Sequence, residues 1–474
     1  MLTYDLDAAG SDPLYVFLYK CIKADIVCGR LTPGEALPSK RAFAKHLGVS
    51  TITVENAYGQ LTSEGYIVSR PRRGFYVAAL SELPLRNRQA AAVLSPEPEA
   101  GRTRAALTQT LAAPRWFADF ASNQTDPERF PFSIWAKISR AVLSREQPAL
   151  MENPPAGGTA QLRRAIAGQL RDFRGMAVSP EQIIVGAGTE YLYGLLIQLL
   201  GFDKIYAVET PGYRKVAQIY RAHGLTVAEI PLDHAGLMPD RLAASGASVV
   251  HLTPSHHFPT GRTMPISRRC ELLGWASRSP NRFIIEDDYD SEFRMNGRPI
   301  PPLYTIDDSR RVIYINTFTK SLASTVRVSY MVLPFPLAAR FYKELRFYAC
   351  TVSTFEQFTL ARFIAEGHYE KHINRTRLAY KRRRDTLLAV IAASPLAARA
   401  RIAEENAGLH FLMTIDTEKP DRALIADAAR EGIHLAALSD YGGAGAHTFV
   451  INYSSIPDGR MAEAVARLYR AVVA

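Results

Sequence analysis

The chain has 474 residues, of which 47% are hydrophobic and 10% aromatic, which is typical of a globular protein. This length exceeds what one hydrophobic core organises, so two or more domains are expected. No apolar run reaches about 18 residues and no basic-then-apolar leader opens the chain, which excludes a predicted membrane span or secretory signal. The net charge of +11 is compatible with a polyanionic partner. The four cysteines lack metal or disulfide spacing, so we expect reduced thiols, no metal site and a cytoplasmic location.

The first predicted domain, residues 12–78, begins with three helices. A periodic apolar pattern over residues 13–28 predicts an amphipathic helix. Ser39 is placed to cap a second, short helix, because serine favours the N-cap position. Ser50 is placed in the same way to cap a third helix over residues 51–64.

A strand, a basic tip and a second strand are predicted next, over residues 66–77. Two helices, a three-residue turn, a third helix and a hairpin form the order of a winged helix-turn-helix, whose third helix enters the major groove of DNA. The alternative interpretation is a small helical docking domain with a solvated basic hairpin. The candidate DNA-binding residues lie at the starts of the second and third helices and at the hairpin tip: Ser39, Lys40, Arg41, Ser50, Thr51, Thr53, Arg70, Arg72 and Arg73.

Three motifs in this domain closely resemble the GntR family of bacterial repressors. They are LPSKRAFA at 37–44, LGVS at 47–50 and TVENAY at 53–58. The resemblance implies that the domain binds promoter DNA. The family often has an arginine just after the serine that opens the third helix, where this chain has Thr51. The resemblance therefore does not extend to an arginine–guanine contact at that position.

The remainder of the chain divides into a connector and a large domain. Residues 79–115 are rich in alanine, proline, glutamate and arginine and sustain no periodic pattern, which predicts a linker. Residues 116–474 alternate helical patterns with short apolar strands. This alternation predicts an α/β domain with a largely parallel sheet covered by helices.

One predicted strand of this domain, residues 312–315, ends in a small polar turn that carries Lys320. A lysine at the end of a buried strand is a candidate imine-forming amine, because burial and a neighbouring cation lower its pKa. Thr317, Thr319 and Arg327 surround it in the sequence and suit a dianionic phosphate. Together these groups suit pyridoxal 5′-phosphate (PLP). The alternative is a surface lysine and arginine on an ordinary strand–loop connection.

Four other predicted strands end in small, aromatic or acidic residues, and ligands of open α/β sheets gather at the carboxyl ends of strands. Asp287 and Tyr289 are two apart, so they face the same side of an extended segment while Asp288 faces away. We therefore predict Asp287 at the ring nitrogen of PLP and Tyr289 at its phenolic oxygen. We predict that the Tyr213 ring stacks against the face of the PLP ring. For each residue taken singly, an ordinary strand-end turn is the alternative.

Four motifs in the large domain resemble the fold-type-I aminotransferases and, more closely, the MocR/GabR subfamily of regulators. They are VETPGY at 208–213, TPSHHFPTG at 253–261, EDDYDSEF at 286–293 and TFTK at 317–320. The resemblance runs from about residue 117 to the end of the sequence. It implies a PLP-dependent transferase fold in which Lys320 forms the internal aldimine. It also implies that five residues hold the phosphate: Gly188, Thr189, Thr317, Thr319 and Arg327.

Departures from the aminotransferase pattern bear on activity. Phe258 stands where the fold usually has an asparagine, so we expect His256 or His257 to supply that hydrogen bond. Val450 aligns with the arginine that binds a substrate α-carboxylate in many relatives, and its loss would weaken the positioning that transamination needs. Residues 152–157 lack a tyrosine that relatives contribute to the phosphate across a dimer. Beside Tyr213, Arg214 and Lys215 are candidates to attract an anionic effector.

The sequence therefore predicts a homodimeric, PLP-dependent transcriptional regulator that binds promoter DNA and senses PLP, an amine or an amino acid through Lys320. We expect at most residual transaminase activity and a cytoplasmic protein that joins the nucleoid when bound to DNA. Two alternatives remain. One is an active aminotransferase with an accessory DNA-binding domain. The other is a regulator that has lost PLP and keeps the fold as a dimerisation scaffold.

Overall fold

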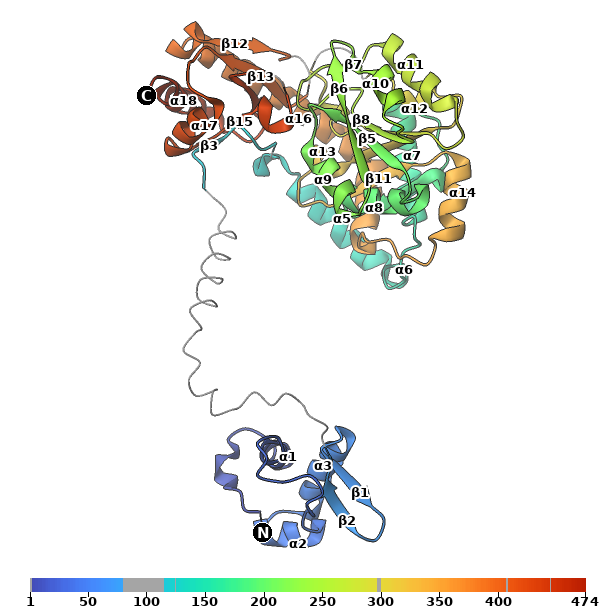
Figure 1. Cartoon of the computed structure of the whole chain (residues 1–474), viewed down its shortest axis with the longest axis vertical. Helices are drawn as coiled ribbons and strands as arrows, with labels where there is room; N and C mark the ends of the chain where they lie inside the picture. Colours follow the sequence, from blue (N-terminus) through green and yellow to red (C-terminus); the bar gives the residue numbers. More distant parts are fainter. Residues whose placement is uncertain (1, 80–114, 124, 296–299, 406–407, 444) are drawn as a thin grey trace. The chain divides into compact units, whose positions relative to one another are not determined.

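The computed structural model describes residues 2–79, 115–123, 125–295, 300–405, 408–443 and 445–474 (Figure 1). The chain separates into two compact units, Met1–Pro114 and Arg115–Ala474. Of the predicted linker at 79–115, residues 80–114 lie outside the described residues. No helix in the described part of the chain combines the length and apolarity needed to cross a membrane.

The first unit has the order of elements predicted for a winged helix-turn-helix. Its elements are η1 (Leu6–Ala9), α1 (Leu14–Val27), α2 (Lys40–Leu47), α3 (Thr51–Ser63), β1 (Ile67–Arg70) and β2 (Gly74–Val77). The two predicted caps are present, since Ser39 accepts a hydrogen bond from the Ala42 amide at 3.2 Å and Ser50 accepts one from the Thr53 amide at 3.1 Å. Phe43 and Tyr58 lie at the centre of its core.

An eight-stranded sheet organises the second unit. Its strands, in spatial order, are β4 (Ile183–Gly186), β11 (Ser329–Val332), β10 (Val312–Thr317), β9 (Phe283–Asp287), β8 (Val249–Leu252), β5 (Ile205–Thr210), β6 (Thr226–Asp233) and β7 (Gly236–Leu237). The five strands from β10 to β6 are parallel, as predicted. The antiparallel exceptions are β11, which pairs with β10 and β4, and β7, which pairs with β6.

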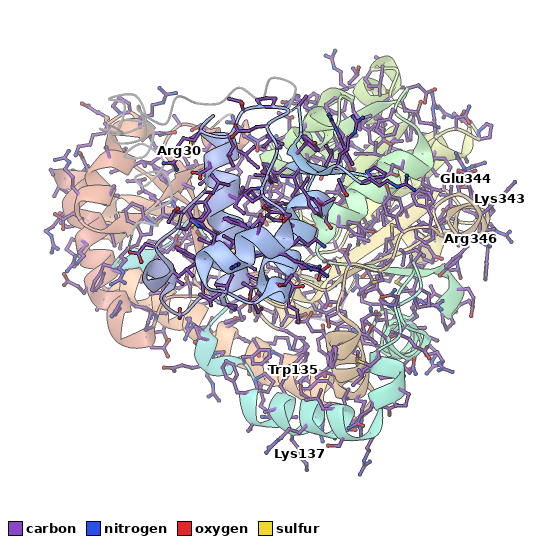
Figure 2. All side chains as sticks on the ribbon, turned by 90° about the horizontal axis from the view of Figure 1, so that it is seen from below. Arg30, Trp135, Lys137, Lys343, Glu344 and Arg346 are labelled. Atoms are coloured by element: carbon purple, nitrogen blue, oxygen red, sulfur yellow. The ribbon has the colours of Figure 1, made fainter. Side chains whose placement is uncertain are left out.

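Helices cover both faces of this sheet. Their bounds are α5 (Phe132–Arg145), α6 (Gln147–Leu150), α7 (Ala160–Arg174), α8 (Thr189–Leu200), α9 (Arg214–Ala222), α10 (Pro239–Ala244), α11 (Ile266–Ser277), α12 (Leu303–Ile306), α13 (Phe318–Ser321), α14 (Phe335–Glu344), α15 (Thr354–Ala365) and α16 (His368–Ala392). Ile313 and Ile315 pack with α8, α9 and α14, whereas Tyr314 faces α5, α7 and α15 on the other side. Charged side chains such as Lys343 and Arg346 point outward at the end of α14 (Figure 2).

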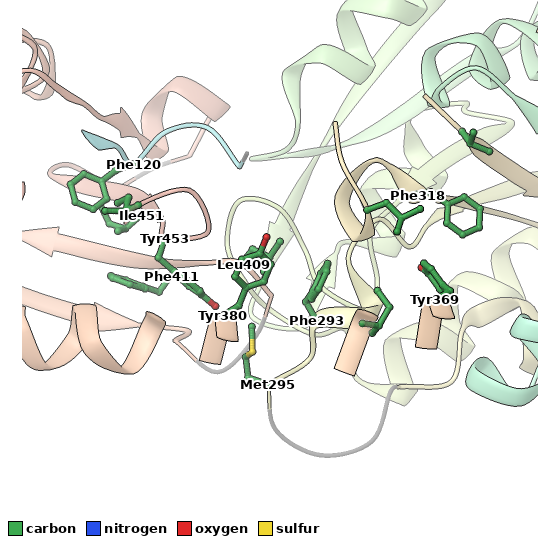
Figure 3. Packing of buried hydrophobic residues seen from close by; sticks show 14 of the residues in the cluster. Phe120, Phe293, Met295, Phe318, Tyr369, Tyr380, Leu409, Phe411, Ile451 and Tyr453 are labelled. Carbon is green, nitrogen blue, oxygen red and sulfur yellow. The ribbon is translucent and has the colours of Figure 1, made fainter. Parts of the chain in front are cut away.

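A second, antiparallel sheet near the C-terminus was not predicted from the sequence. It has the order β12 (Ala400–Ala403), β13 (His410–Ile415), β16 (Thr448–Asn452) and β15 (Ala436–Ala437), and α17 (Asp421–Arg430) and α18 (Met461–Val473) accompany it. A short pair, β3 (Ala118–Asp119) with β14 (Ile433–His434), ties the start of the unit to it. Phe411 and Ile451 from this sheet, with Tyr453 directly after β16, belong to the same core as Tyr380 of α16 (Figure 3).

Candidate functional site

A cavity of about 500 Å³ opens at the carboxyl ends of β5, β8, β9 and β10. This is where a parallel α/β sheet offers a ligand its free strand ends. Most of the predicted cofactor residues line this cavity, although in the sequence they are spread from residue 189 to residue 327. They are Thr189, Tyr213, Asp287, Tyr289, Thr317, Thr319, Lys320 and Arg327, and Lys215 also lines the cavity.

Lys320 is held in a short helix directly after the central strand β10. Thr317 caps this helix, since its hydroxyl accepts a hydrogen bond from the Thr319 amide at 3.1 Å. The Lys320 amine donates to the carbonyl oxygen of Asn123 at 3.1 Å. Burial lowers the pKa of this amine, and the nearby Asp290 carboxylate opposes the shift. A lowered pKa increases the fraction of neutral, nucleophilic amine.

Asp287, at the end of β9, has one satisfied and one unsatisfied carboxylate oxygen. Its Oδ2 accepts a hydrogen bond from the Tyr193 hydroxyl at 2.7 Å and lies 3.4 Å from His251 Nε2. His251 is anchored in turn by Tyr220, whose hydroxyl lies 2.8 Å from its Nδ1. Asp287 Oδ1 is buried and has no hydrogen-bond partner among the described residues. Such an oxygen is costly unless a ligand supplies a donor.

Tyr289 and His256 occupy neighbouring positions, but only Tyr289 lines the cavity. His256 Nδ1 lies 3.1 Å from the Tyr289 hydroxyl and 2.7 Å from Asp290 Oδ2. Burial raises the pKa of the Tyr289 phenol, so that it stays protonated. The structure therefore places His256 next to Tyr289 and away from the cavity wall where direct contact with the cofactor was predicted. Tyr213 is half exposed, and its ring meets Phe258 edge-on at 5.8 Å.

One end of the cavity combines a glycine, a helix N-terminus and two cations. Gly188 has φ of 93°, a left-handed conformation that favours glycine, and a Cβ there would displace the Arg327 guanidinium. Thr189 opens α8, where backbone amides lack helical partners. Arg327 lies 3.5 Å from Glu190, and Lys215 also pairs with Glu190. Because Arg327 and Lys215 share the single carboxylate of Glu190, this end of the cavity keeps a net positive charge that suits an anion.

Several cavity residues were missed by sequence reasoning. Glu209 accepts hydrogen bonds from the Thr253 amide at 2.9 Å and hydroxyl at 2.8 Å, and burial raises its pKa to about 7. It lies within the VETPGY motif, so that motif could have identified it. Tyr193 and His251 lie inside regular elements, and Asn123 lies in a loop, so no local pattern marks them.

Two further residues from the sequence analysis do not line the cavity: Arg214, a candidate effector residue, and Val450, which stands where relatives have a substrate-binding arginine. Arg214 is exposed and does not line the cavity, and its guanidinium lies 3.5 Å from the Ser439 carbonyl. Val450 is buried in the middle of β16, opposite Leu412 and Ala436. Among the described residues that line the cavity, Arg327 is the only arginine.

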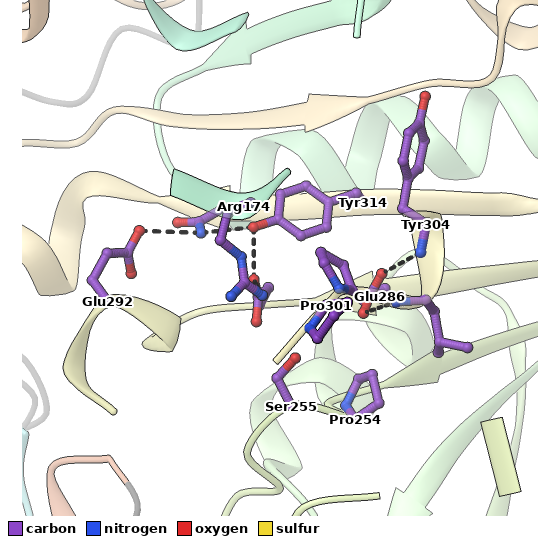
Figure 4. A network of polar contacts seen from close by, with 12 residues as sticks. Arg174, Pro254, Ser255, Glu286, Glu292, Pro301, Tyr304 and Tyr314 are labelled. Carbon is purple, nitrogen blue, oxygen red and sulfur yellow. Dashed lines mark hydrogen bonds and ion pairs between the residues drawn. The ribbon is translucent and has the colours of Figure 1, made fainter. Parts of the chain in front are cut away.

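Behind β9, on the side away from the cavity, lies a buried polar network (Figure 4). Asp288 Oδ2 accepts hydrogen bonds from Arg174 at 2.5 Å and from the Tyr314 hydroxyl at 2.7 Å. Glu286 accepts from the backbone amides of Leu303 at 2.7 Å and Tyr304 at 3.0 Å. These contacts join β9 to α7, β10 and α12, which fixes the strand that presents Asp287.

In the first unit, several predicted DNA-binding side chains already have protein partners. Ser39 and Ser50 act as helix caps, and the hydroxyls of Ser50 and Thr53 lie 2.9 Å apart. The Lys40 amine lies 2.6 Å from Glu55. Seven of the nine predicted residues are exposed: Ser39, Arg41, Ser50, Thr51, Arg70, Arg72 and Arg73. The structure thus leaves α3 and the hairpin tip accessible to DNA.

Comparison with known proteins agrees with this architecture. The model of the bacterial regulatory proteins of the gntR family matches residues 14–77, and the model of aminotransferase class I and II matches residues 117–468. The chain is 32% identical to the "Probable rhizopine catabolism regulatory protein MocR" of Rhizobium meliloti, over 93% of this chain and 89% of that protein. It is 31% identical to the HTH-type pyridoxine biosynthesis transcriptional regulator PdxR of Corynebacterium glutamicum, over 91% and 89%.

The chain belongs to the MocR/GabR subfamily of GntR-family transcriptional regulators. As a MocR-type regulator, it joins a helix-turn-helix DNA-binding domain to a domain with the aminotransferase fold. The fold of the second domain is also that of the kynurenine aminotransferase of Pyrococcus horikoshii, with a TM-score of 0.66 and 24% identity over 78% of this chain and 94% of that one.

Proposed function

We propose that this MocR-type regulator binds PLP in the cavity and that PLP, or an amine or amino acid that reacts with it, changes how tightly the first unit binds promoter DNA. One observation carries the proposal. The buried Asp287 Oδ1, which has no partner among the described residues, shares a cavity with an amine whose pKa burial lowers. A carboxylate oxygen that needs a donor and a nucleophilic amine are the two groups that PLP requires.

The remaining residues fit the shape and charge of the same cofactor. Lys320 would hold the aldehyde, Asp287 Oδ1 would accept the pyridine N–H, and the Tyr289 hydroxyl would donate to the ring oxygen. The glycine turn at Gly188, with the hydroxyls of Thr189, Thr317 and Thr319 and the Arg327 guanidinium, would hold the phosphate. When bound, PLP supplies an aldehyde that captures amines and a ring that withdraws electrons.

The lack of an arginine for a substrate α-carboxylate favours a sensing role over catalytic turnover. Among the described residues that line the cavity, the only arginine is Arg327, which is already assigned to the phosphate, and Val450 stands where many relatives have the carboxylate-binding arginine. Without a bidentate arginine, an α-carboxylate is poorly positioned, and positioning is a large part of transamination rate. Apart from Lys320 and Arg327, Lys215 is the one lysine or arginine among the described residues of the wall, and it would attract an anionic effector.

We propose further that the chain acts as a homodimer, as aminotransferase-fold domains usually do, and that two DNA-binding units then favour paired half-sites. An effector can change DNA binding only by its differential affinity for the two states of the dimer. The response should therefore be reciprocal, so that bound DNA changes the apparent affinity for the effector by the same factor.

A titration of the purified full chain tests the proposal. PLP and candidate amines are added while the visible absorption of lysine-bound PLP and the binding of a duplex selected by the protein from a random library are followed in the same samples. Lys320→Ala should abolish the absorption band and the effector response of DNA binding. Lys343→Ala, an exposed lysine of α14, is the matched control and should preserve both.

The outcome is decisive in either direction. If Lys320→Ala leaves both the spectrum and the DNA response unchanged, the proposal is wrong. If the wild-type protein shows multiple-turnover transamination with a common amino acid, the active aminotransferase becomes the better description. If the pure protein takes up no PLP, the second unit is a scaffold.

A further inference from the structure

The excess positive charge of the chain does not lie mainly in its DNA-binding domain. In the printed sequence, residues 1–79 carry nine lysines and arginines and seven acidic residues, and therefore contribute +2 of the net +11. Residues 115–474 contribute +8, with 44 basic and 36 acidic residues. Helix α16 alone has seven basic residues and two acidic ones, a net charge of +5 within 25 residues.

The seven cations of α16 differ in their exposure. Arg383 and Arg384 are buried and paired, Arg383 with Asp126 and Asp458, and Arg384 with Asp385. Arg383 thereby fixes the helix to the rest of the unit, and Arg384 does so by donating to the Glu405 carbonyl at 3.0 Å. Arg377 and Lys381 are half-buried, and the remaining three cations are exposed.

Lys371, Arg375 and Arg382 form this exposed group, which we call the basic face of α16. Together with Leu378, which is 56% exposed, they follow one another at steps of four, three and four residues and so lie on one side of the helix. None of the three cations has a carboxylate within ion-pair distance among the described residues. The row extends for about 16 Å along the helix axis.

We propose that the basic face of α16 is a second DNA-contacting surface, which binds the phosphate backbone outside the sequence recognised by the helix-turn-helix. Charge complementarity supports this occupant, because duplex DNA presents one phosphate charge per about 1.7 Å of its axis and releases counterions wherever a cation neutralises one. The chain is a DNA-binding regulator whose recognition domain carries little net charge of its own. Sequence-independent phosphate contacts on the effector domain would supply affinity and position a longer stretch of DNA.

The salt dependence of DNA binding by the full-length protein tests this proposal without any effector. The probe is a duplex of about 60 base pairs centred on a sequence that the protein selects from a random library, because the slope of log K against log salt reports the number of neutralised phosphates. The triple variant Lys371→Gln, Arg375→Gln, Arg382→Gln should reduce that slope by about 2.7, at about 0.9 per lost contact. Each single variant should reduce it by about 0.9.

A charge-matched control separates a local contact from a general effect of net charge. The triple variant Arg164→Gln, Arg241→Gln, Arg278→Gln removes three exposed arginines scattered over α7, α10 and the end of α11. It should leave the slope close to the wild-type value. The proposal is overturned if the α16 variant keeps the wild-type slope, as it would if this face binds an acidic protein, or if both triple variants lower the slope equally. Because the readout needs no PLP, failure of the proposed sensing function would not affect it.

Discussion

Two neighbouring aspartates at the end of β9 lie in different environments on its two sides. Asp288 faces Arg174 and Tyr314 in a buried network, where both partners are supplied by the protein. Each carboxylate has one oxygen, Oδ1, without a protein donor among the described residues, but only Asp287 lines the cavity. The two side chains have the same chemistry and similar burial, at 9% and 2% exposure. The difference teaches that an oxygen without a partner marks a ligand site only where it also opens onto a cavity.

The largest expected effect is on the network side. Asp288→Ala leaves the Arg174 guanidinium buried without its carboxylate, so we expect the free energy of unfolding to fall by about 3–5 kcal/mol. Chemical denaturation of the full chain, followed by fluorescence of the second unit, measures this loss. The double variant Arg174→Met, Asp288→Leu removes both charges and should recover most of the stability. A small loss in the single variant would contradict a structural role for this side of β9.

The next largest effect is the contribution of Glu209, on the cavity side, to the pH dependence of the unfolding free energy. Its pKa rises from an ordinary 4.5 to about 7 in the folded protein, chiefly through burial. The pKa of Glu209 is higher in the folded than in the unfolded state, so its protonated form stabilises the fold. This stabilisation is complete below about pH 4.5 and is lost as pH rises through about 7. The loss in unfolding free energy is roughly 3 kcal/mol in all.

Glu209→Gln should therefore flatten the decline in unfolding free energy between about pH 4.5 and pH 8, relative to the wild type. The comparison is made by denaturation of both PLP-free proteins across this range. Glu271→Gln, an exposed glutamate of α11, is the control and should decline as the wild type does. Parallel curves for wild type and Glu209→Gln would show that Glu209 ionises normally.

On the cavity side, Asp287→Asn should change ligand binding much more than stability. The amide keeps the shape but loses the charge that holds the pyridine N–H, and hydrogen bonds to charged groups contribute about 1.5–3 kcal/mol. We therefore expect PLP to bind about 10- to 100-fold more weakly, as measured by titration of the visible absorption band. The unfolding free energy without PLP should change by about 1 kcal/mol or less. If Asp287→Asn and Asp288→Ala lowered the unfolding free energy equally, the distinction between the cavity side and the network side of β9 would be wrong.

The sequence predicted those features that depend on neighbouring residues. The helix caps at Ser39 and Ser50, the parallel strands and the opposite directions of Asp287 and Asp288 all follow from local spacing. The family motifs added the positions of Lys320 and Arg327. Arg174 lies 114 positions from Asp288, and Tyr193 lies 94 from Asp287, so no local pattern could pair them. The C-terminal sheet was missed for the same reason, because its short strands pair across long intervals of sequence.

The smallest effect tests the partner of Asp287 that sequence reasoning missed. Tyr193→Phe removes the hydroxyl that donates to Asp287 Oδ2 and keeps the buried ring. The carboxylate then loses its hydrogen bond from the protein and is less firmly oriented, so PLP affinity should fall by about 1 kcal/mol, or about fivefold. Tyr206→Phe is a matched control, because its hydroxyl contacts the Gly201 carbonyl at 3.4 Å, away from the cavity. An unchanged PLP affinity in Tyr193→Phe would mean that Oδ1 is positioned by the backbone of β9 and not by the hydrogen bond to its neighbouring oxygen.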